Sequence, residues 1–574
     1  MAELADAADL KSAAARAASR FDPGRPHGAA RIHVTPSKMT LTALRPAAPA
    51  LLLSALVLAP FLGKAFTMDD TVFLFEAEHA LRDPLHPTAF EMAWTEVPQR
   101  ISTIVPTGPV MAWLLVPTAL AGGAEWIAHL TQLALLWVAI LATVSLALRL
   151  GLAPRWATAA GLLLAATPAV LGMAGTAMPD VPAMAVGVAG IERLVAWRDE
   201  RRVHQAAAAA VLLALAPLTR THLVLLFPLG ALWMVGDVLS PAAWRRGPWT
   251  RWIPLALAPV LAIGLGLLTR DPAGGGGTLA AAASGLSHRR FIPPHLASFG
   301  VHWVLAMAFA LPWALVRWRS VLGRWWVLLA ATAGAASVLR LGHVRDASYA
   351  LAPVAGLGLA VLVDVLVDAV RRRDGAQAVL GLWLLLAVPT AVYVHLPAKY
   401  LLPSAPAAAI LLARAMAERP RIGRPVLALT LALGVALGVA ILRADAAFAG
   451  LGRQAARTLI APSVAAGHRV WYAGHWGFQW YAEKAGARFF PVTPPYPEVG
   501  DLVVSSANSE PHIVPEEMDA LARLGRLEDR SPGGRVMDRR SGAGFFSSSW
   551  GYLPWSWSDG IIDAYDVWRV VPQP

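Results

Sequence analysis

Cysteine is absent from this chain of 574 residues. A disulfide framework, a thiolate metal site and a cysteine nucleophile are therefore excluded, although the absence says nothing about the compartment. Charged residues are also scarce, at 15% against 56% hydrophobic residues, whereas a soluble domain usually carries about 25% charged residues. This balance is typical of a polytopic membrane protein and argues against a soluble multidomain enzyme.

Several catalytic signatures are missing as well. The sequence holds no Walker A loop, no GxGxxG at a strand–helix turn, no HExxH and no nucleophile elbow. A clear inverted repeat, which many transporters show, is not detected either. The net charge of +12 could indicate nucleic-acid binding. However, the basic residues lie mostly in short loops between apolar stretches, where they set orientation in a membrane.

Long apolar stretches dominate what remains, and a spanning helix needs roughly 20 such residues. About 13 stretches read as spans, of which the Ala-rich pair 204–219 and 221–239 is the weakest. The predicted spans are 46–66, 128–148, 156–174, 181–197, 204–219, 221–239, 252–269, 300–316, 323–340, 347–369, 376–394, 400–416 and 424–442. Residues 106–121 are short and rich in proline, so we interpret them as a re-entrant or interfacial helix.

Arginine sets the predicted orientation in a cell (inner or plasma) membrane. The basic tail 1–45 has no signal-peptide core with a cleavage site, so it is predicted as a cytoplasmic tail without a fixed fold. If residues 106–121 do not cross the membrane, every later loop on the cytoplasmic side is rich in arginine. The predicted outer segments are then 67–127, 175–180, 270–299, 341–349, 395–400 and the chain after about 444.

The composition changes after residue 443. VWYAG (470–474) and DLVVSS (501–506) read as short buried strands, and 476–486 reads as a helix that ends at Gly486. We therefore expect residues 444–574 to form a small extracytoplasmic α/β domain. The aromatic stretch from Trp550 to Trp568 fits either the water–lipid boundary or ordinary packing.

Three acids lie at predicted outer helix mouths: Asp69, Asp70 and Asp180. Each can simply cap a helix start, because an Asp side chain there accepts amide hydrogen bonds. Alternatively, a carboxylate of the first pair takes a proton from an incoming hydroxyl or amine, and Asp180 orients that carboxylate or the acceptor. The three acids could also supply oxygen ligands to a divalent metal, although no spacing rule supports this.

Basic and aromatic side chains occupy other predicted outer segments. Arg and Lys suit phosphate, and near a bilayer a phosphate-bearing lipid is the obvious anion. The alternative is that these residues anchor the chain at the interface. The sets are His288, Arg289 and Arg290; His343, Arg345, Asp346 and Tyr349; and His395, Lys399 and Tyr400.

The order of motifs resembles a known family. An acidic pair follows the first span, a proline-led apolar helix runs into GGAEW (122–126), and GTAMPD and YLLPSAPA come later. Over about residues 46–416 this resembles the GT-C membrane glycosyltransferases, in particular bacterial proteins similar to protein O-mannosyltransferases and the lipid A aminoarabinose transferase. The C-terminal Y-A-E-x-x-G stretch is similar to bacterial members too.

The resemblance implies a polyprenyl-phosphate-linked sugar as donor, a glycan, lipid or protein acceptor, and inverting transfer on the outer face. By position, Asp69 matches the first-loop catalytic acid, Asp180 the second-loop acid, and Lys399 with Tyr400 the late loop that meets the donor phosphate. His288 and Arg289 match the variable outer loop more loosely. One departure is Thr107-Gly108-Pro109, where many relatives carry Lys-Pro.

Two other classes stay open from the residues alone. A transporter or flippase for a lipid-linked or anionic solute would need polar groups deep inside its spans, whereas most charges here lie at helix mouths. A non-catalytic envelope assembly protein with a degenerate site is the second alternative.

Overall fold

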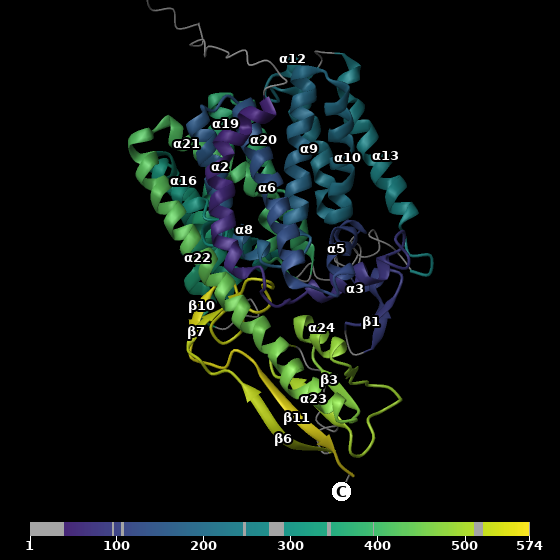
Figure 1. Cartoon of the computed structure of the whole chain (residues 1–574). Coiled ribbons are helices and arrows are strands. Elements are labelled where there is room, and N and C mark those ends of the chain that lie inside the picture. Colours follow the sequence, from purple (N-terminus) through teal and green to yellow (C-terminus); the bar gives the residue numbers. More distant parts are fainter. Residues whose placement is uncertain are drawn as a thin grey trace, which may run out of the picture. The chain divides into compact units, whose positions relative to one another are not determined.

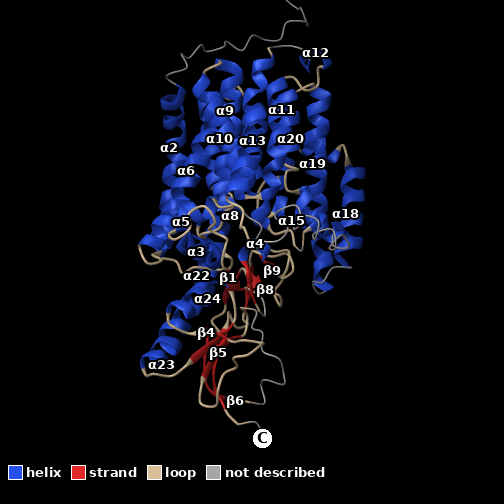
Figure 2. Cartoon of the chain, turned by 90° about the vertical axis from the view of Figure 1, so that its right-hand side faces the viewer, coloured by secondary structure: helices blue, strands red, loops and turns tan. Residues whose placement is uncertain are grey.

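The computed structural model describes residues 39–94, 97–104, 108–244, 248–274, 292–340, 346–393, 395–509 and 520–572. The described residues from Ala43 onwards form one compact unit. It holds many helices and, towards the C-terminus, a set of strands (Figures 1 and 2).

The described residues between Met39 and Ala465 are mainly helical. The first group is α2 (Met39–Leu58), α3 (Asp70–Ala80), α4 (Ile101–Ile104), α5 (Val110–Leu120), α6 (Glu125–Arg149), α7 (Pro154–Ala165), α8 (Pro168–Ala174), α9 (Asp180–Glu200), α10 (Val203–Thr219), α11 (Leu226–Val235), α12 (Pro241–Trp244) and α13 (Ile253–Leu268). The second is α15 (Ile292–Val304), α16 (Ala310–Val316), α17 (Trp318–Leu322), α18 (Trp325–Arg340), α19 (Ala352–Arg372), α20 (Gly375–Trp383), α21 (Ala405–Glu418), α22 (Pro420–Ala455) and α23 (Ala461–Ala465).

Apolar helices of membrane-spanning length recur among the described residues. By length and composition 7 qualify, or up to 8 if one bent pair counts as a single span. The chain is thus a helical, multi-pass membrane protein. The predicted count of about 13 spans is not confirmed, because several predicted stretches form shorter helices, among them Val203–Thr219 and Trp325–Leu339.

Two predicted spans are broken in the middle. α7 and α8 meet at an angle of 58°, where Pro168 has no N–H to continue the helical hydrogen bonds. α15 and α16 are separated by a loop in which Ala308 has a φ of 47°. The two breaks contact each other, since Ala169 N donates to Ala306 O over 2.9 Å.

The strands follow a long helix that leaves the group of apolar helices. α22 has 36 residues, about 54 Å at 1.5 Å per residue, and a bilayer core is only about 30 Å thick. Its C-terminal part packs on α24 (Trp476–Lys484) and β7 (Gly533–Arg535). Figure 1 shows α22 reaching from the other helices to the strands.

A five-stranded mixed sheet has the order β4-β3-β5-β11-β6. Its strands are β3 (Val470–Ala473), β4 (Arg488–Phe489), β5 (Leu502–Ser506), β6 (Leu521–Glu528) and β11 (Ala564–Val570). β3 runs parallel to β4 and β5, while β11 is antiparallel to β5 and β6. Both predicted strands and the predicted helix are therefore present; the domain boundary near residue 444 stays a prediction.

Shorter strands flank this sheet. They are β1 (Glu91–Ala93) paired with β2 (Pro98–Arg100), β7 paired with β10 (Ser556–Ser558), and β8 (Met537–Asp538) paired with β9 (Ala543–Gly544). Of the six aromatic residues between Trp550 and Trp568, Trp550, Tyr552 and Tyr565 are buried, whereas Trp557 is 65% exposed. Ordinary packing therefore accounts for half of that aromatic stretch.

Candidate active site

Asp70 holds the entry to α3 in place. One of its carboxylate oxygens accepts from Thr67 N over 2.9 Å, and the other accepts from Ala177 N over 2.7 Å. The carboxylate is fully buried, and burial raises its pKa to about 7 against the opposing effect of nearby Lys64. Both oxygens are thus used by backbone amides. Neither amide belongs to the first turn of α3, so Asp70 ties the loop before α3 to the segment before α9 and does not cap its helix.

Asp69 points to a different part of the molecule. Its Oδ2 lies 2.7 Å from Lys399 Nζ, and the Asp69 side chain is 33% exposed while that of Lys399 is 3% exposed. Burial opposes ionisation of Asp69, but the Lys399 ammonium outweighs it and holds the pKa of Asp69 below its usual value. Asp69 is therefore a solvent-accessible carboxylate, ionised at neutral pH, with a buried cation behind it.

Asp180 begins α9 and pairs with Arg220, which is not among the predicted site residues. Arg220 Nη2 lies 2.7 Å from Asp180 Oδ2, with side-chain exposures of 12% and 1%. Arg220 follows the end of α10 in an extended conformation, and its guanidinium sits 5.4 Å from the centroid of the Tyr400 ring. Its one sequence signal is that it breaks the rule placing arginine on the inner side.

Tyr400 connects this pair to the late loop. Lys399 and Tyr400 lie in the 3₁₀ helix η8 (Ala398–Ser404). Tyr400 Oη is 3.3 Å from His395 Nε2, and His395 Nδ1 is 3.3 Å from Ser547 Oγ. Burial, reinforced by Lys399, lowers the pKa of His395 to about 3, so this imidazole is neutral near pH 7.

We call Asp69, Asp180, Arg220 and Lys399 together the Asp69 group. Their side-chain charges balance. Asp69 and Asp180 supply two negative charges, and Arg220 and Lys399 supply two positive ones. A phosphate placed here would need further cations or would have to take Lys399 from Asp69. The predicted phosphate contacts His288, Arg289, Arg290 and Arg345, together with His343, lie outside the described residues. The Asp346 side chain does too, and Tyr349 is 55% exposed.

Gly108 lies at a position where no side chain fits. A Cβ at this position would lie 2.4 Å from Leu218 O, which is far inside van der Waals contact. The backbone before α5 therefore packs directly on the backbone that leads to Arg220. α5 itself has 11 residues, about 16 Å, and is too short to cross a bilayer.

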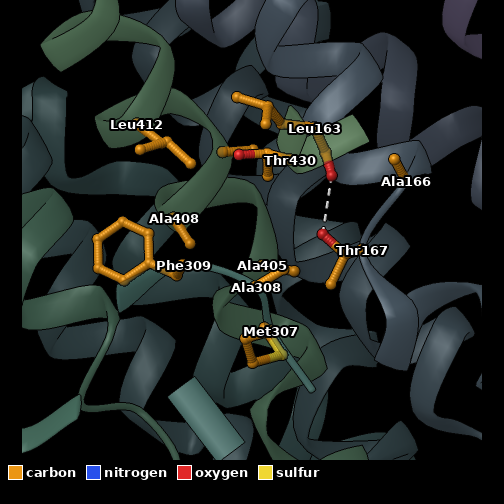
Figure 3. A pocket seen from close by; sticks show the side chains of 11 residues that line it. Leu163, Ala166, Thr167, Met307, Ala308, Phe309, Ala405, Ala408, Leu412 and Thr430 are labelled. Carbon is orange, nitrogen blue, oxygen red and sulfur yellow. Dashed lines mark hydrogen bonds between the residues drawn. The ribbon is translucent and has the colours of Figure 1, made fainter. Parts of the chain in front are cut away.

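No group of three or more His, Asp or Glu residues able to hold a metal ion occurs among the described residues. The three acids proposed as oxygen ligands are divided, because Asp70 binds backbone amides, Asp180 binds Arg220 and Asp69 binds Lys399. A small cavity between α7, α21 and α22 lies apart from this group (Figure 3). Its volume of about 10 Å³ is that of about one water site.

No family model and no curated protein matches this sequence. Among solved structures, ArnT from Cupriavidus metallidurans bound to undecaprenyl phosphate matches at 14% identity and a TM-score of 0.41, over 82% of this chain and 93% of that one. The Archaeoglobus fulgidus oligosaccharyltransferase in the apo form matches at 12% and 0.42, over 79% and 64%. The mycobacterial arabinofuranosyltransferase AftD matches at 15% and 0.40, over 93% and 42%. These are distant likenesses to GT-C fold glycosyltransferases.

Proposed function

We propose that this protein transfers a sugar from a polyprenyl-phosphate-linked donor to an acceptor on the outer face of the membrane. The observation that carries the proposal is the Asp69–Lys399 pair beside Asp180 and Arg220. Four segments far apart in the sequence bring these side chains together next to apolar helices. An accessible carboxylate and buried cations beside apolar helices suit a substrate that carries a hydrocarbon chain and a phosphate.

Asp69 is the residue proposed to activate the acceptor. Its carboxylate takes the proton of the acceptor hydroxyl or amine as that atom forms a bond to the anomeric carbon. The bond between the anomeric carbon and the phosphate oxygen breaks at the same time, and polyprenyl phosphate leaves. Attack opposite the leaving group inverts the configuration at the sugar.

Lys399 is proposed to exchange partners during this reaction. In the structure it neutralises Asp69, which keeps that carboxylate a weak base. If the donor phosphate draws the Lys399 ammonium away, Asp69 becomes a stronger base. It can then take the proton of the acceptor. The same movement places a positive charge where the leaving phosphate gains negative charge. Asp180 and Arg220 are proposed to hold Tyr400 and the late loop in position.

The outer-face assignment rests on the arginine pattern and on the location of Asp69, Asp180 and Lys399 in the predicted outer segments. The N-terminal tail is then cytoplasmic and residues 444–574 are extracytoplasmic. Arg289 and Arg290, with His288 and Arg345, are proposed to complete the phosphate site.

Release of free polyprenyl phosphate tests the proposal directly. The purified protein in detergent is incubated with a lipid-linked-sugar extract of its native membrane and an acceptor fraction, and the lipids are followed by mass spectrometry. The wild-type protein should convert a polyprenyl-phosphate sugar to polyprenyl phosphate, and Asp69→Asn should not. A transporter moves its solute intact, so a folded protein that never cleaves the donor would support that alternative.

A further inference from the structure

A second basic site lies between α17, α18 and α19. These helices enclose a cavity of about 410 Å³, whose lining includes Arg319, Arg324, Arg371, Trp326, Val363 and Val367. α18 packs along α19, as Figure 2 shows. Arg371 lies four residues before the span Gly375–Val392, and His395 lies three residues after it. A span of that length separates its ends by about 27 Å, so this cavity is distinct from the Asp69 group.

The neighbouring acids are already engaged by other arginines. Arg317 binds Asp368, and Arg317 and Arg372 both bind Glu418, at 3.1 and 2.9 Å. Asp364 binds Arg324 and also accepts from Trp313 Nε1 over 2.9 Å.

Two of the arginines that line the cavity are therefore not neutralised by these acids. Among the described residues, Arg319 and Arg371 have no carboxylate partner, and Arg319 instead stacks near the Trp318 ring at 5.2 Å. The cavity therefore carries a surplus of positive charge on two exposed side chains, which favours an anion.

Apart from Ser320 and Gly323, the rest of the lining is apolar, and it continues onto the helix surface. Val363 is 40% exposed, and along α18 Trp325, Trp326 and Leu329 are 63%, 62% and 60% exposed. In a membrane protein such an exposed stripe faces acyl chains, and tryptophan favours the level of the headgroups. Cations above an apolar surface match a molecule with a phosphate at one end and hydrocarbon at the other.

We propose that this cavity binds the phosphate-bearing headgroup of an anionic phospholipid. Arg319 and Arg371 contact the phosphate, Arg324 is held beside them by Asp364, and the acyl chains lie along the exposed face of α18. Basic pockets between membrane helices on the cytoplasmic side commonly take anionic headgroups, and the arginine pattern predicts that side for the cavity. The proposal holds whether or not the protein is a transferase.

Lipid retention measured by native mass spectrometry tests this site. The purified full-length protein is delipidated in detergent and titrated with phosphatidylglycerol or phosphatidylcholine. We expect preference for phosphatidylglycerol, and Arg319→Gln with Arg371→Gln should weaken its binding by about tenfold or more. Arg421→Gln with Arg424→Gln is the matched control, because both residues are exposed at another predicted inner loop; it should change binding less than about twofold.

Equal affinity for the two lipids, or equal loss in both double variants, would overturn the proposal. Inorganic phosphate separates the two sources of the anion. If millimolar phosphate alone binds, in a manner lost in the Arg319 and Arg371 variant, while phosphatidylglycerol shows no preference, the cavity is a free-phosphate site and the lipid assignment is wrong. Variants that elute as aggregates are replaced by the two single substitutions, each of which should give part of the loss.

Discussion

Lys399 Nζ lies 2.7 Å from Asp69 Oδ2, although 330 residues separate them in the sequence. The adjacent Asp70 points away and binds two backbone amides. Neighbouring carboxylates thus have different surroundings, one next to a buried cation and open to solvent, the other enclosed. This division leads to different expectations for the two acids.

Asp69→Asn should abolish transfer in a protein that still folds, with some loss of stability because Lys399, which is 3% exposed, loses its counterion. The amide keeps the size of the side chain but cannot take the acceptor proton, so we expect a loss in kcat of about 10²- to 10⁴-fold. Release of polyprenyl phosphate measures activity, and thermal unfolding in detergent measures stability. Normal turnover in this variant would refute the role assigned to Asp69.

Asp70→Asn should behave differently. Asp70 accepts one hydrogen bond from Thr67 N and one from Ala177 N. The side-chain nitrogen of asparagine would face one of these two N–H groups and could not accept from it. We expect the lost hydrogen bond to cost about 1–3 kcal/mol of stability. Stability and transfer should fall together. A stable, inactive Asp70→Asn protein would show instead that Asp70 takes part in the reaction.

The local features of this site follow from the sequence, and the pairings do not. Asp69, Asp180 and Lys399 were expected at helix mouths because each borders an apolar stretch. Arg220 stands between two predicted spans, and nothing local reveals that it reaches Asp180 on a different helix. The support of His395 by Ser547 joins residues 152 positions apart, which periodicity does not report.

The predicted spans show the same limit. Hydropathy identifies apolar stretches, but it does not predict where a helix breaks, as at Pro168 and Ala308. Arginines expected to set orientation also serve a second purpose. Arg149, for example, is buried against Glu192 at 2.8 Å and Glu200 at 2.7 Å. Such ion pairs satisfy buried charges between helices whichever way the helices face.

Arg220→Gln should destabilise the protein by about 3 kcal/mol, because it leaves the buried Asp180 carboxylate without its counterion. Arg220→Lys keeps the charge and should cost less, although lysine cannot stack as a planar group on Tyr400. The double variant Asp180→Asn, Arg220→Gln should recover part of the stability but not the activity. Thermal unfolding of the wild-type protein, Asp180→Asn, Arg220→Gln and the double variant gives the coupling energy. Additive effects would mean that the pair does not act as a unit.

Gly108→Ala should reduce transfer through the backbone. The added methyl meets Leu218 O at 2.4 Å, so the segment leading to Arg220 must move. Gly264→Ala is the matched control, because its Cβ meets nothing within 4 Å and alanine favours the helix. We expect the first variant to lose activity and the second to keep it. Equal activity of both would show that the contact between residues 108 and 218 does not position the site.

The orientation of the chain can be measured because it has no native cysteine. Ser531→Cys and Arg424→Cys each place a single thiol at an exposed position. A membrane-impermeant maleimide added to intact cells should label the first variant and not the second, and permeabilised cells should show both labelled. The reverse pattern would place the strands on the cytoplasmic side and remove the outer-face proposal.

The sheet should lose stability between mildly acidic and neutral pH. Asp563 is fully buried and accepts from Asn508 N over 2.8 Å and Ser509 Oγ over 3.1 Å, and burial raises its pKa from 3.8 to about 6. The folded state therefore holds this proton more tightly than the unfolded chain. Its contribution to stability is complete below pH 4 and is lost as pH rises through 6, by about 3 kcal/mol at most.

Hydrogen exchange at the amides of β5 and β11 measures this effect locally, at pH 4.5 and 7 after correction for intrinsic exchange rates. Asp563→Asn should flatten the pH dependence, because its amide keeps the acceptor oxygen for Asn508 N and stays neutral throughout. Asp538→Asn is the control, since that acid is only partly buried and its substitution should leave the slope unchanged. Protection that rises with pH in the wild-type protein would mean that Asp563 is ionised and stabilised in the folded state, contrary to the burial argument.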